Sequence, residues 1–268
     1  MDIPPLFHYM WCDKNDKKAK IYPAKYNDNV VNMQKINPNY TFHIWSYDEV
    51  IRLMTQDPFL IQYIDFVPTI TPWISVCDFL RMCVVYALGG IYSDLDFIPI
   101  KNFKLLLDGK SDYFVYEAIE STGFSRSVFN GFFASYPKNP FIKGWIETMK
   151  ENIIALYNTR HNAFTVLAST GPRGLRRYKD IKWPNKRIYS PCGVLLYTGD
   201  IGGKSIGGKT IDCLNTEDDL YAYTAWSNGT KWHEEYTIGT TFLAKLSTHF
   251  FLFLGIIILY VLNYKLDR

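Results

Sequence analysis

Short apolar segments alternate with longer amphipathic segments along the first 160 or so residues. The short segments are rich in aromatic and β-branched residues, which is typical of strands, and the longer ones have helical periodicity. We expect strands at residues 5–11, 40–45, 91–100 and 113–118, and helices at 46–55, 71–88 and 140–157. Strands that alternate with helices predict an α/β fold with a mostly parallel central sheet.

The helix expected from residue 71 leads directly into an acidic segment. Thr71 is the expected N-cap, with Pro72 as the first helical residue, and Gly89-Gly90 provides the signal that ends a helix. The strand that follows reads IYSDLDFIPI. Side chains two residues apart share one face of a strand, so Asp94 and Asp96 are expected to point the same way, together with Tyr92.

Two neighbouring carboxylates repel each other unless a cation compensates their charge. Mg²⁺ or Mn²⁺ is suited to this role, because such ions bind through one or two carboxylates plus substrate phosphates. We therefore expect a metal and diphosphate site at Asp94 and Asp96. Asp78 and Arg81 share a face of the preceding helix and are expected to bind the sugar, although a surface ion pair is the alternative.

The spacing of these residues carries a family resemblance. The string SxxDxxRxxxxYxxGGIYxDxD runs from Ser75 to Asp96 and resembles glycosyltransferase family 32, the DXD sugar-binding group. This group includes fungal inositol-phosphoceramide mannosyltransferases and is related to the glucosylating domains of large clostridial toxins. Segments 3–11, 37–46, 130–141 and 169–175 are also similar to blocks of the family, so the resemblance covers about residues 3 to 232.

The resemblance implies a GT-A-like nucleotide-sugar-binding fold, a UDP- or GDP-sugar donor, a metal cofactor (Mn²⁺ or Mg²⁺) and transfer with retention of configuration. It implies a catalytic group made of Asp78, Arg81, Asp94 and Asp96. Trp11 would stack on the nucleotide base, although a core role is the alternative. The implied substrate-binding residues are Trp11, Asp78, Arg81, Tyr92, Asp94, Thr170, Gly171, Thr230 and Trp232.

One segment departs from the family pattern. Family members close the domain with a His, a Trp and a Gly-Ser-Trp, whereas this chain has TAWSNGTKW at 224–232. The resemblance then assigns Asn228 or Thr230 as an oxygen ligand of the metal and Trp232 as a lid contact. Asn228-Gly229-Thr230 also fits an N-glycosylation acceptor.

The last part of the chain is strongly apolar. Leu246–Tyr264 would form about 28 Å of helix at about 1.5 Å per residue, close to the thickness of a bilayer core. We expect a transmembrane helix there, with a buried core helix as the alternative, and no signal peptide at the N-terminus. The expected organisation is a glycosyltransferase domain at 1–235, a linker at 236–245, the membrane helix at 246–264 and a tail at 265–268.

A single C-terminal anchor would place the enzyme at a membrane, on a side that the flanking charges leave open. It favours a lipid-linked or membrane-proximal glycan, or a glycolipid, as the acceptor.

Two other functions are compatible with parts of the sequence. Residues 203–210 (GKSIGGKT) fit the phosphate-binding loop of a nucleotide hydrolase. The segment IDCLNTEDDL that follows is a poor helix, so a flexible glycine-rich loop is expected instead. A non-catalytic, membrane-anchored carbohydrate-binding protein is the third possibility, but a binder would not need the acidic pair.

Charge and cysteine content exclude other classes. The chain has 29 Lys and Arg against 26 Asp and Glu, a net charge of +3, and no basic stripe, so no nucleic-acid partner is expected. Its five cysteines, at positions 12, 77, 83, 192 and 213, have no CxxC spacing. Free thiols are therefore expected, without a zinc site or a disulfide framework.

Overall fold

The computed structural model describes residues 2–18, 21–116, 127–156, 163–189, 195–198 and 221–225. The chain divides into two units, Met1–Gly229 and Thr230–Arg268, and all described residues belong to the first. Within these ranges no helix is long and apolar enough to cross a membrane. The predicted membrane helix at 246–264 and the glycine-rich segment at 203–210 lie outside them, and the predicted domain boundaries remain predictions.

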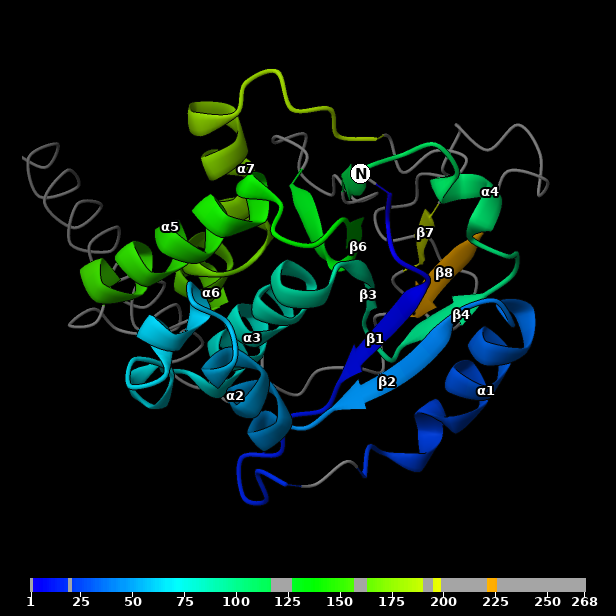
Figure 1. The fold of residues 1–268 in the computed structure, drawn as a ribbon, viewed down its shortest axis with the longest axis horizontal. Helices are drawn as coiled ribbons and strands as arrows, with labels where there is room; N and C mark the ends of the chain where they lie inside the picture. Colours follow the sequence, from blue (N-terminus) through cyan, green and yellow to red (C-terminus); the bar gives the residue numbers. More distant parts are fainter. Residues whose placement is uncertain are drawn as a thin grey trace, which may run out of the picture. The chain divides into compact units, whose positions relative to one another are not determined.

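Five strands form the central sheet, in the order β2, β1, β3, β6 and β5 (Figure 1). β1 pairs in parallel with both β2 and β3, whereas β6 pairs antiparallel with β3 and with β5. β6 is thus the strand that opposes the others, and the predicted α/β fold with a mostly parallel sheet is confirmed. The strands are β1 Leu6–Met10, β2 Thr41–Trp45, β3 Gly90–Ser93, β5 Asp112–Tyr116 and β6 Val128–Ser135.

The residues predicted as one strand at 91–100 are divided between two sheets. β4 (Phe97–Pro99) pairs with β8 (Ala222–Ala225), which pairs with β7 (Leu195–Thr198). The prediction of one continuous strand over 91–100 is therefore wrong. The backbone N–H of Asp94 donates to the Gly131 carbonyl at 2.8 Å, and then the chain turns, with Phe97 N–H directed at the Asp94 carbonyl at 3.4 Å. The acidic residues lie in this turn between the two sheets.

The helices largely follow the sequence pattern. Ser46 caps α2 in a capping box with Glu49. The prediction of Thr71 as the cap of α3 is wrong: Pro72 is the N-cap, because its backbone is extended (ψ 172°), and the helix begins at Trp73. The described helices are α1 Asn27–Ile36, α2 Tyr47–Thr55, α3 Trp73–Leu88, α4 Lys104–Leu107, α5 Pro140–Leu156, α6 Ala163–Ser169 and α7 Pro172–Lys182, with 3₁₀ turns η1 Ala24–Tyr26, η2 Leu60–Tyr63 and η3 Val67–Thr69.

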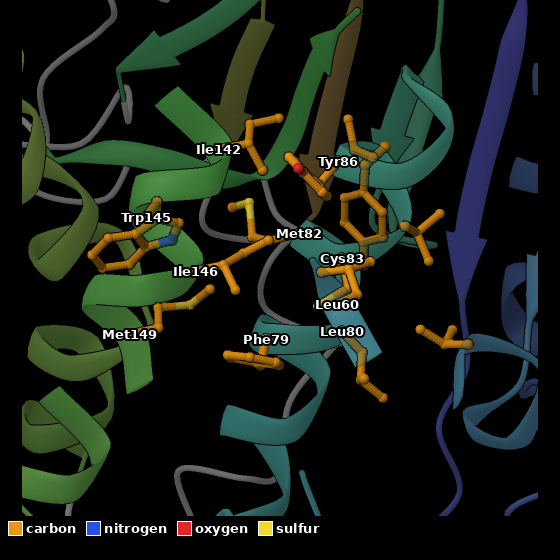
Figure 2. Packing of buried hydrophobic residues seen from close by; sticks show 14 of the residues in the cluster. Leu60, Phe79, Leu80, Met82, Cys83, Tyr86, Ile142, Trp145, Ile146 and Met149 are labelled. Carbon is orange, nitrogen blue, oxygen red and sulfur yellow. The ribbon is translucent and has the colours of Figure 1, made fainter. Parts of the chain in front are cut away.

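The central sheet separates two hydrophobic cores. Alternate residues of a strand face opposite sides, and β3 shows this directly: Ile91 packs in the core that contains α1, and Tyr92 packs in the core that contains α3 and α5. Figure 2 shows the second core, where side chains of α3 meet those of α5. Its labelled members are Leu60, Phe79, Leu80, Met82, Cys83, Tyr86, Ile142, Trp145, Ile146 and Met149.

The two glycines between α3 and β3 allow a close approach of the backbone. Gly89 and Gly90 have φ values of +67° and +96°, which favour glycine. A Cβ atom on Gly90 would lie 2.6 Å from the Leu6 carbonyl oxygen, and one on Gly89 would lie 2.8 Å from the backbone nitrogen of Pro137. β3 can therefore start beside β1 only with glycine at these two positions.

The buried His8 joins three segments at the same place. Its Nε2–H donates to the Gly89 carbonyl at 2.8 Å, and its Nδ1 accepts from the Trp45 indole N–H at 3.1 Å. Burial lowers the pKa of His8 to about 4, so the ring is neutral at physiological pH.

We predict that Gly89→Ala destabilises the protein more than Gly109→Ala does. Both glycines have φ near +65°, but a Cβ at Gly109 meets no atom within 4 Å. Gly109→Ala should therefore cost only the backbone strain, about 1–2 kcal/mol, and Gly89→Ala should cost at least about 1–3 kcal/mol more because of the clash. Urea unfolding of both variants measures the difference, and equal losses would contradict the packing described here.

Candidate functional site

The predicted site residues cluster where parallel strands end. Trp11 directly follows β1 and Asp94 directly follows β3. Because β1 and β3 pair in parallel, their carboxyl ends lie at the same edge of the sheet. This edge is where α/β proteins commonly bind nucleotides and other ligands.

Asp94 is held by two neighbours through one of its oxygens. The Tyr92 hydroxyl donates to Oδ1 at 2.8 Å, and Arg81 Nη1 donates to the same atom at 3.1 Å. Its other oxygen, Oδ2, lies where a Cβ on Gly131 would come within 2.5 Å. The side chain is 36% exposed. Oδ1 of Asp94 is thus held by two hydrogen bonds, and the side chain is partly open to solvent. Oδ2 occupies space that is available because residue 131 is glycine.

Arg81 connects Asp94 to a second, deeper carboxylate. Its Nη2 lies 3.2 Å from Asp78 Oδ1, and both residues are almost fully buried, with 6% and 5% of their surface exposed. The predicted sharing of one helix face by this pair is confirmed, and the alternative of a surface ion pair is wrong. One guanidinium therefore compensates two carboxylates.

Three further residues complete the hydrogen bonding of Asp78 and Arg81. Asn130 Nδ2 donates to Asp78 Oδ1 at 3.1 Å, and the Thr170 hydroxyl donates to Oδ2 at 2.9 Å. Arg81 also donates to the carbonyls of Asn130, at 3.1 Å, and Cys77, at 3.4 Å. Buried charges are tolerated only when they are paired and hydrogen-bonded in this way.

The two members of the buried pair have different protonation behaviour. Burial raises the pKa of Asp78 to about 6, although the charge of Arg81 and the Thr170 hydroxyl act in the opposite direction. For Arg81, burial favours the neutral form, but the carboxylates of Asp94 and Asp78 more than offset it and raise its pKa. Arg81 stays charged at every pH at which the protein is folded.

Asp96 lies two residues after Asp94 in the same turn, which contacts the start of α1. Asn29 Nδ2 donates to the Leu95 carbonyl at 3.1 Å and so anchors the turn. Burial, together with the charges of Asp96 and Asp94, raises the pKa of Tyr26 to about 12. Both carboxylates are therefore close enough to the Tyr26 hydroxyl for their negative charge to raise its pKa.

The comparison with protein families identifies this part of the chain. Residues 23–113 match the family described as "Glycosyltransferase sugar-binding region containing DXD motif", and the match includes α3 and the acidic turn. This region is thus similar to the DXD glycosyltransferases. The family resemblance predicted from the spacing between Ser75 and Asp96 is thereby confirmed.

Two curated relatives agree with the DXD glycosyltransferase assignment. "Inositol phosphoceramide mannosyltransferase 1" of Schizosaccharomyces pombe is 27% identical over 176 residues, which is 63% of this chain and 49% of that protein. An uncharacterized glycosyltransferase of Acanthamoeba polyphaga mimivirus is 25% identical over 174 residues, 65% of this chain and 63% of that protein. The chain spans about half to two thirds of the length of these relatives.

Two solved glycosyltransferase structures have some similarity to this chain. "PaToxG Glycosyltransferase" has a TM-score of 0.48 and 17% identity, with 68% of this chain and 70% of that chain covered. A UDP-bound glycosyltransferase domain from the YGT toxin has a TM-score of 0.36 and 9% identity, with 62% and 56% covered.

The other predicted substrate contacts of this glycosyltransferase region stay predictions. Trp11 is half-buried, and its backbone N–H donates to the Trp45 carbonyl at 3.0 Å. Thr170 is fully buried and contacts Asp78, and Gly171, the next residue, is the N-cap of α7. The remaining predicted residues, Asn228, Thr230 and Trp232, lie outside the described residues.

Four residues that organise the site were not predicted from the sequence. Asn130 and Gly131 lie on β6, and Tyr26 and Asn29 lie at the start of α1. The dipeptide Asn130-Gly131 carried a usable signal, because a polar residue and a glycine precede the apolar run FFA in a buried strand. Tyr26 and Asn29 had no comparable signal in the mixed segment before β2.

The described residues offer two carboxylates for a metal, Asp94 and Asp96. They contain no cluster of three or more His, Cys, Asp or Glu side chains. Two carboxylate ligands suit Mg²⁺ or Mn²⁺, because these ions usually complete their coordination with water and substrate phosphates. The donor set present in the turn therefore fits the predicted ion.

We predict that Thr170→Val destabilises the protein more at neutral pH than at pH 4. Because the pKa of Asp78 is about 6 in the folded protein and ordinarily 3.8, its ionisation destabilises the fold as the pH rises through this range. Loss of the Thr170 hydroxyl removes a donor to the ionised carboxylate, which should cost about 1.5–3 kcal/mol at pH 7.5 and about 1 kcal/mol at pH 4. Urea unfolding at the two pH values measures both losses.

Thr148→Val is the matched control. The Thr148 hydroxyl donates to the neutral Gly144 carbonyl at 2.8 Å within α5, so its loss should be the same at both pH values. A pH-independent effect of Thr170→Val would show that its hydroxyl does not act on a titrating carboxylate.

Proposed function

We propose that the protein transfers a hexose from a UDP- or GDP-sugar to a lipid-linked or membrane-proximal glycan, in a metal-dependent reaction that retains anomeric configuration. The observation that carries this proposal is the buried network in which Arg81 joins Asp78 to the exposed Asp94. It places a fixed, partly exposed carboxylate at the edge of the sheet, within a region that is similar to the DXD glycosyltransferases.

Asp94 and Asp96 would hold Mn²⁺ or Mg²⁺. Asp94 Oδ1 is engaged by Tyr92 and Arg81, so Oδ2, which lies beside Gly131, is the better placed ligand. When bound, the ion would neutralise the negative charge that develops on the departing nucleoside diphosphate. Asn228 and Thr230 remain the proposed additional oxygen ligands.

Asp78 and Arg81 would form the floor beneath the donor sugar. Most of their hydrogen-bonding groups already bind partners within the protein. The small part of each side chain that is exposed would hydrogen-bond to sugar hydroxyls. Arg81 therefore has two roles in the proposal. It contacts the sugar, and it positions the Asp94 carboxylate so that little reorganisation accompanies the reaction.

The nature of the acceptor rests on two separate supports. A relative carries the name inositol phosphoceramide mannosyltransferase, which describes a lipid acceptor for that protein. The apolar segment at 246–264 would keep the enzyme at a membrane, where lipid-linked acceptors are found.

Trp11 would stack on the base of the donor, since it follows β1 beside the acidic turn.

A donor screen tests the proposal. The full-length protein is incubated with UDP- and GDP-hexoses and with Mn²⁺, Mg²⁺ or a chelator, and the release of nucleoside diphosphate is measured. We expect nucleoside diphosphate to be released from either the UDP-hexoses or the GDP-hexoses, and only when a divalent ion is present. Asp94→Asn and Asp96→Asn should each lower the rate by about 100-fold or more, since metal stabilisation of the leaving group contributes several kcal/mol.

Asp108→Asn serves as the control, because it removes a carboxylate from an exposed position at the end of α4. Its rate should equal that of the parent protein. The proposal fails if no donor is hydrolysed, or if the two variants of the acidic turn keep the parental rate.

A further inference from the structure

The segment from Pro172 to Arg187, which contains α7, carries a local excess of positive charge. It has seven Lys and Arg residues against one acidic residue, a net charge of +6, whereas the whole chain has a net charge of +3. The rest of the chain is therefore net negative. A concentration of one sign of charge in one segment attracts a partner of the opposite sign.

One face of α7 is held within the protein. Leu175 and Tyr178 are 0% and 4% exposed and belong to the core that contains α3 and α5. The Tyr178 hydroxyl donates to the Phe141 carbonyl at 3.0 Å and accepts from the Trp183 indole N–H at 2.7 Å. α7 lies beside α5 (Figure 1). These contacts fix the orientation of the helix, so its opposite face is held toward solvent.

The opposite face combines cations with an exposed apolar side chain. Arg173, Arg177 and Ile181 lie in one row, because residues four apart share a face of a helix. All three are exposed, and Ile181 is exposed to 62%. The acidic residue of the segment, Asp180, is ion-paired with Arg176, so its charge is compensated locally. We refer to the row Arg173, Arg177 and Ile181 as the basic face of α7.

We propose that the basic face of α7 docks on an anionic lipid bilayer. Basic residues beside an exposed apolar side chain are typical of helices that lie at a membrane surface. The cations attract anionic headgroups, and the apolar side chain enters the boundary between headgroups and acyl chains. RNA is also anionic, but its recognition uses cations with aromatic or polar side chains. The exposed isoleucine therefore favours a bilayer.

The position of α7 relates this docking to the acceptor, a step that rests on the proposed function. The Thr170 hydroxyl donates to Asp78 at 2.9 Å, and α7 begins at Pro172. Arg173, the first member of the basic face, is thus close in the chain to a direct contact of the proposed sugar site. A bilayer on this face would bring lipid headgroups toward that site, which suits a lipid-linked acceptor.

Photo-cross-linking to lipid tests the docking without an assay of activity. The photoreactive residue p-benzoylphenylalanine replaces Ile181 in the full-length protein. The protein is irradiated with vesicles of phosphatidylcholine, or of phosphatidylcholine and phosphatidylserine in equal parts, and lipid adducts are measured by mass spectrometry. We expect adducts with the mixed vesicles and few with the neutral vesicles. The same replacement at Val31, which is 58% exposed on α1, is the matched control and should give few adducts with either.

Both labelled proteins contain the same apolar segment at 246–264. The comparison between positions 181 and 31 therefore does not depend on whether that segment enters the vesicles.

A charge variant tests the electrostatic part of the docking. Arg173→Gln combined with Arg177→Gln, in the protein labelled at position 181, should lower the adduct yield at least about fivefold, because each basic residue near an anionic bilayer strengthens binding about fivefold. Lys35→Gln combined with Arg52→Gln removes two exposed cations from α1 and α2 and should leave the yield unchanged. An increase in salt from about 0.1 to about 1 M should also lower the yield, since it shortens the screening length from about 10 to about 3 Å.

Urea unfolding shows whether the variants keep the fold. All four substituted residues are exposed, so the unfolding midpoints should equal that of the parent protein. The proposal is overturned if position 181 gives no more adducts than position 31, or if phosphatidylserine does not raise the yield. It is also overturned if the folded Arg173 and Arg177 variant keeps the parental yield, or if position 181 cross-links to an added RNA oligonucleotide in place of lipid.

Donor hydrolysis measured on the same samples separates this inference from the proposed function. Lipid docking by a protein that hydrolyses no donor would refute the proposed function and leave the docking surface established. Hydrolysis of a donor by a protein that gives no lipid adducts at position 181 would refute the docking surface alone.

Discussion

A single buried cation holds the site of this protein together. The Arg81 guanidinium lies between the carboxylates of Asp78 and Asp94, and each depends on it for charge compensation. Burial of the Asp78 carboxylate without a cation would be strongly unfavourable, and removal of one partner from a buried ion pair typically costs several kcal/mol. The contacts of this group reach β6 through Asn130 and the start of α7 through Thr170. These polar contacts therefore link the same elements that hydrophobic packing brings together.

The acidic turn owes its position to a change of sheet. β3 ends at Ser93 in the central sheet, and the chain enters β4 of the second sheet at Phe97. Asp94 and Asp96 lie in this junction, and both are half-buried. Gly131 on β6 provides the remaining space, because any larger residue would meet Asp94 Oδ2. The exposure of this carboxylate follows from topology and from one glycine.

Much of this arrangement could be predicted from the sequence. Local signals were sufficient for α2, α3, the glycine pair and the shared face of Asp78 and Arg81, since capping, periodicity and spacing act over a few residues. The break between β3 and β4 was missed because alternation in IYSDLDFIPI is the same for one strand or two. Asn130 was missed for a different reason. Its role depends on contacts with residues about 50 positions earlier in the chain, which no local pattern records.

His8 has a consequence for motion in the molecule. It uses both ring nitrogens to join β1 to Trp45 on β2 and to Gly89 at the start of β3. These bonds cross the centre of the sheet, so β1, β2 and the start of β3 are not expected to separate by a local fluctuation. Amide protons of the central strands there should exchange with solvent only when the whole unit unfolds. Any structural adjustment to an incoming molecule is therefore expected in the segments around these three strands.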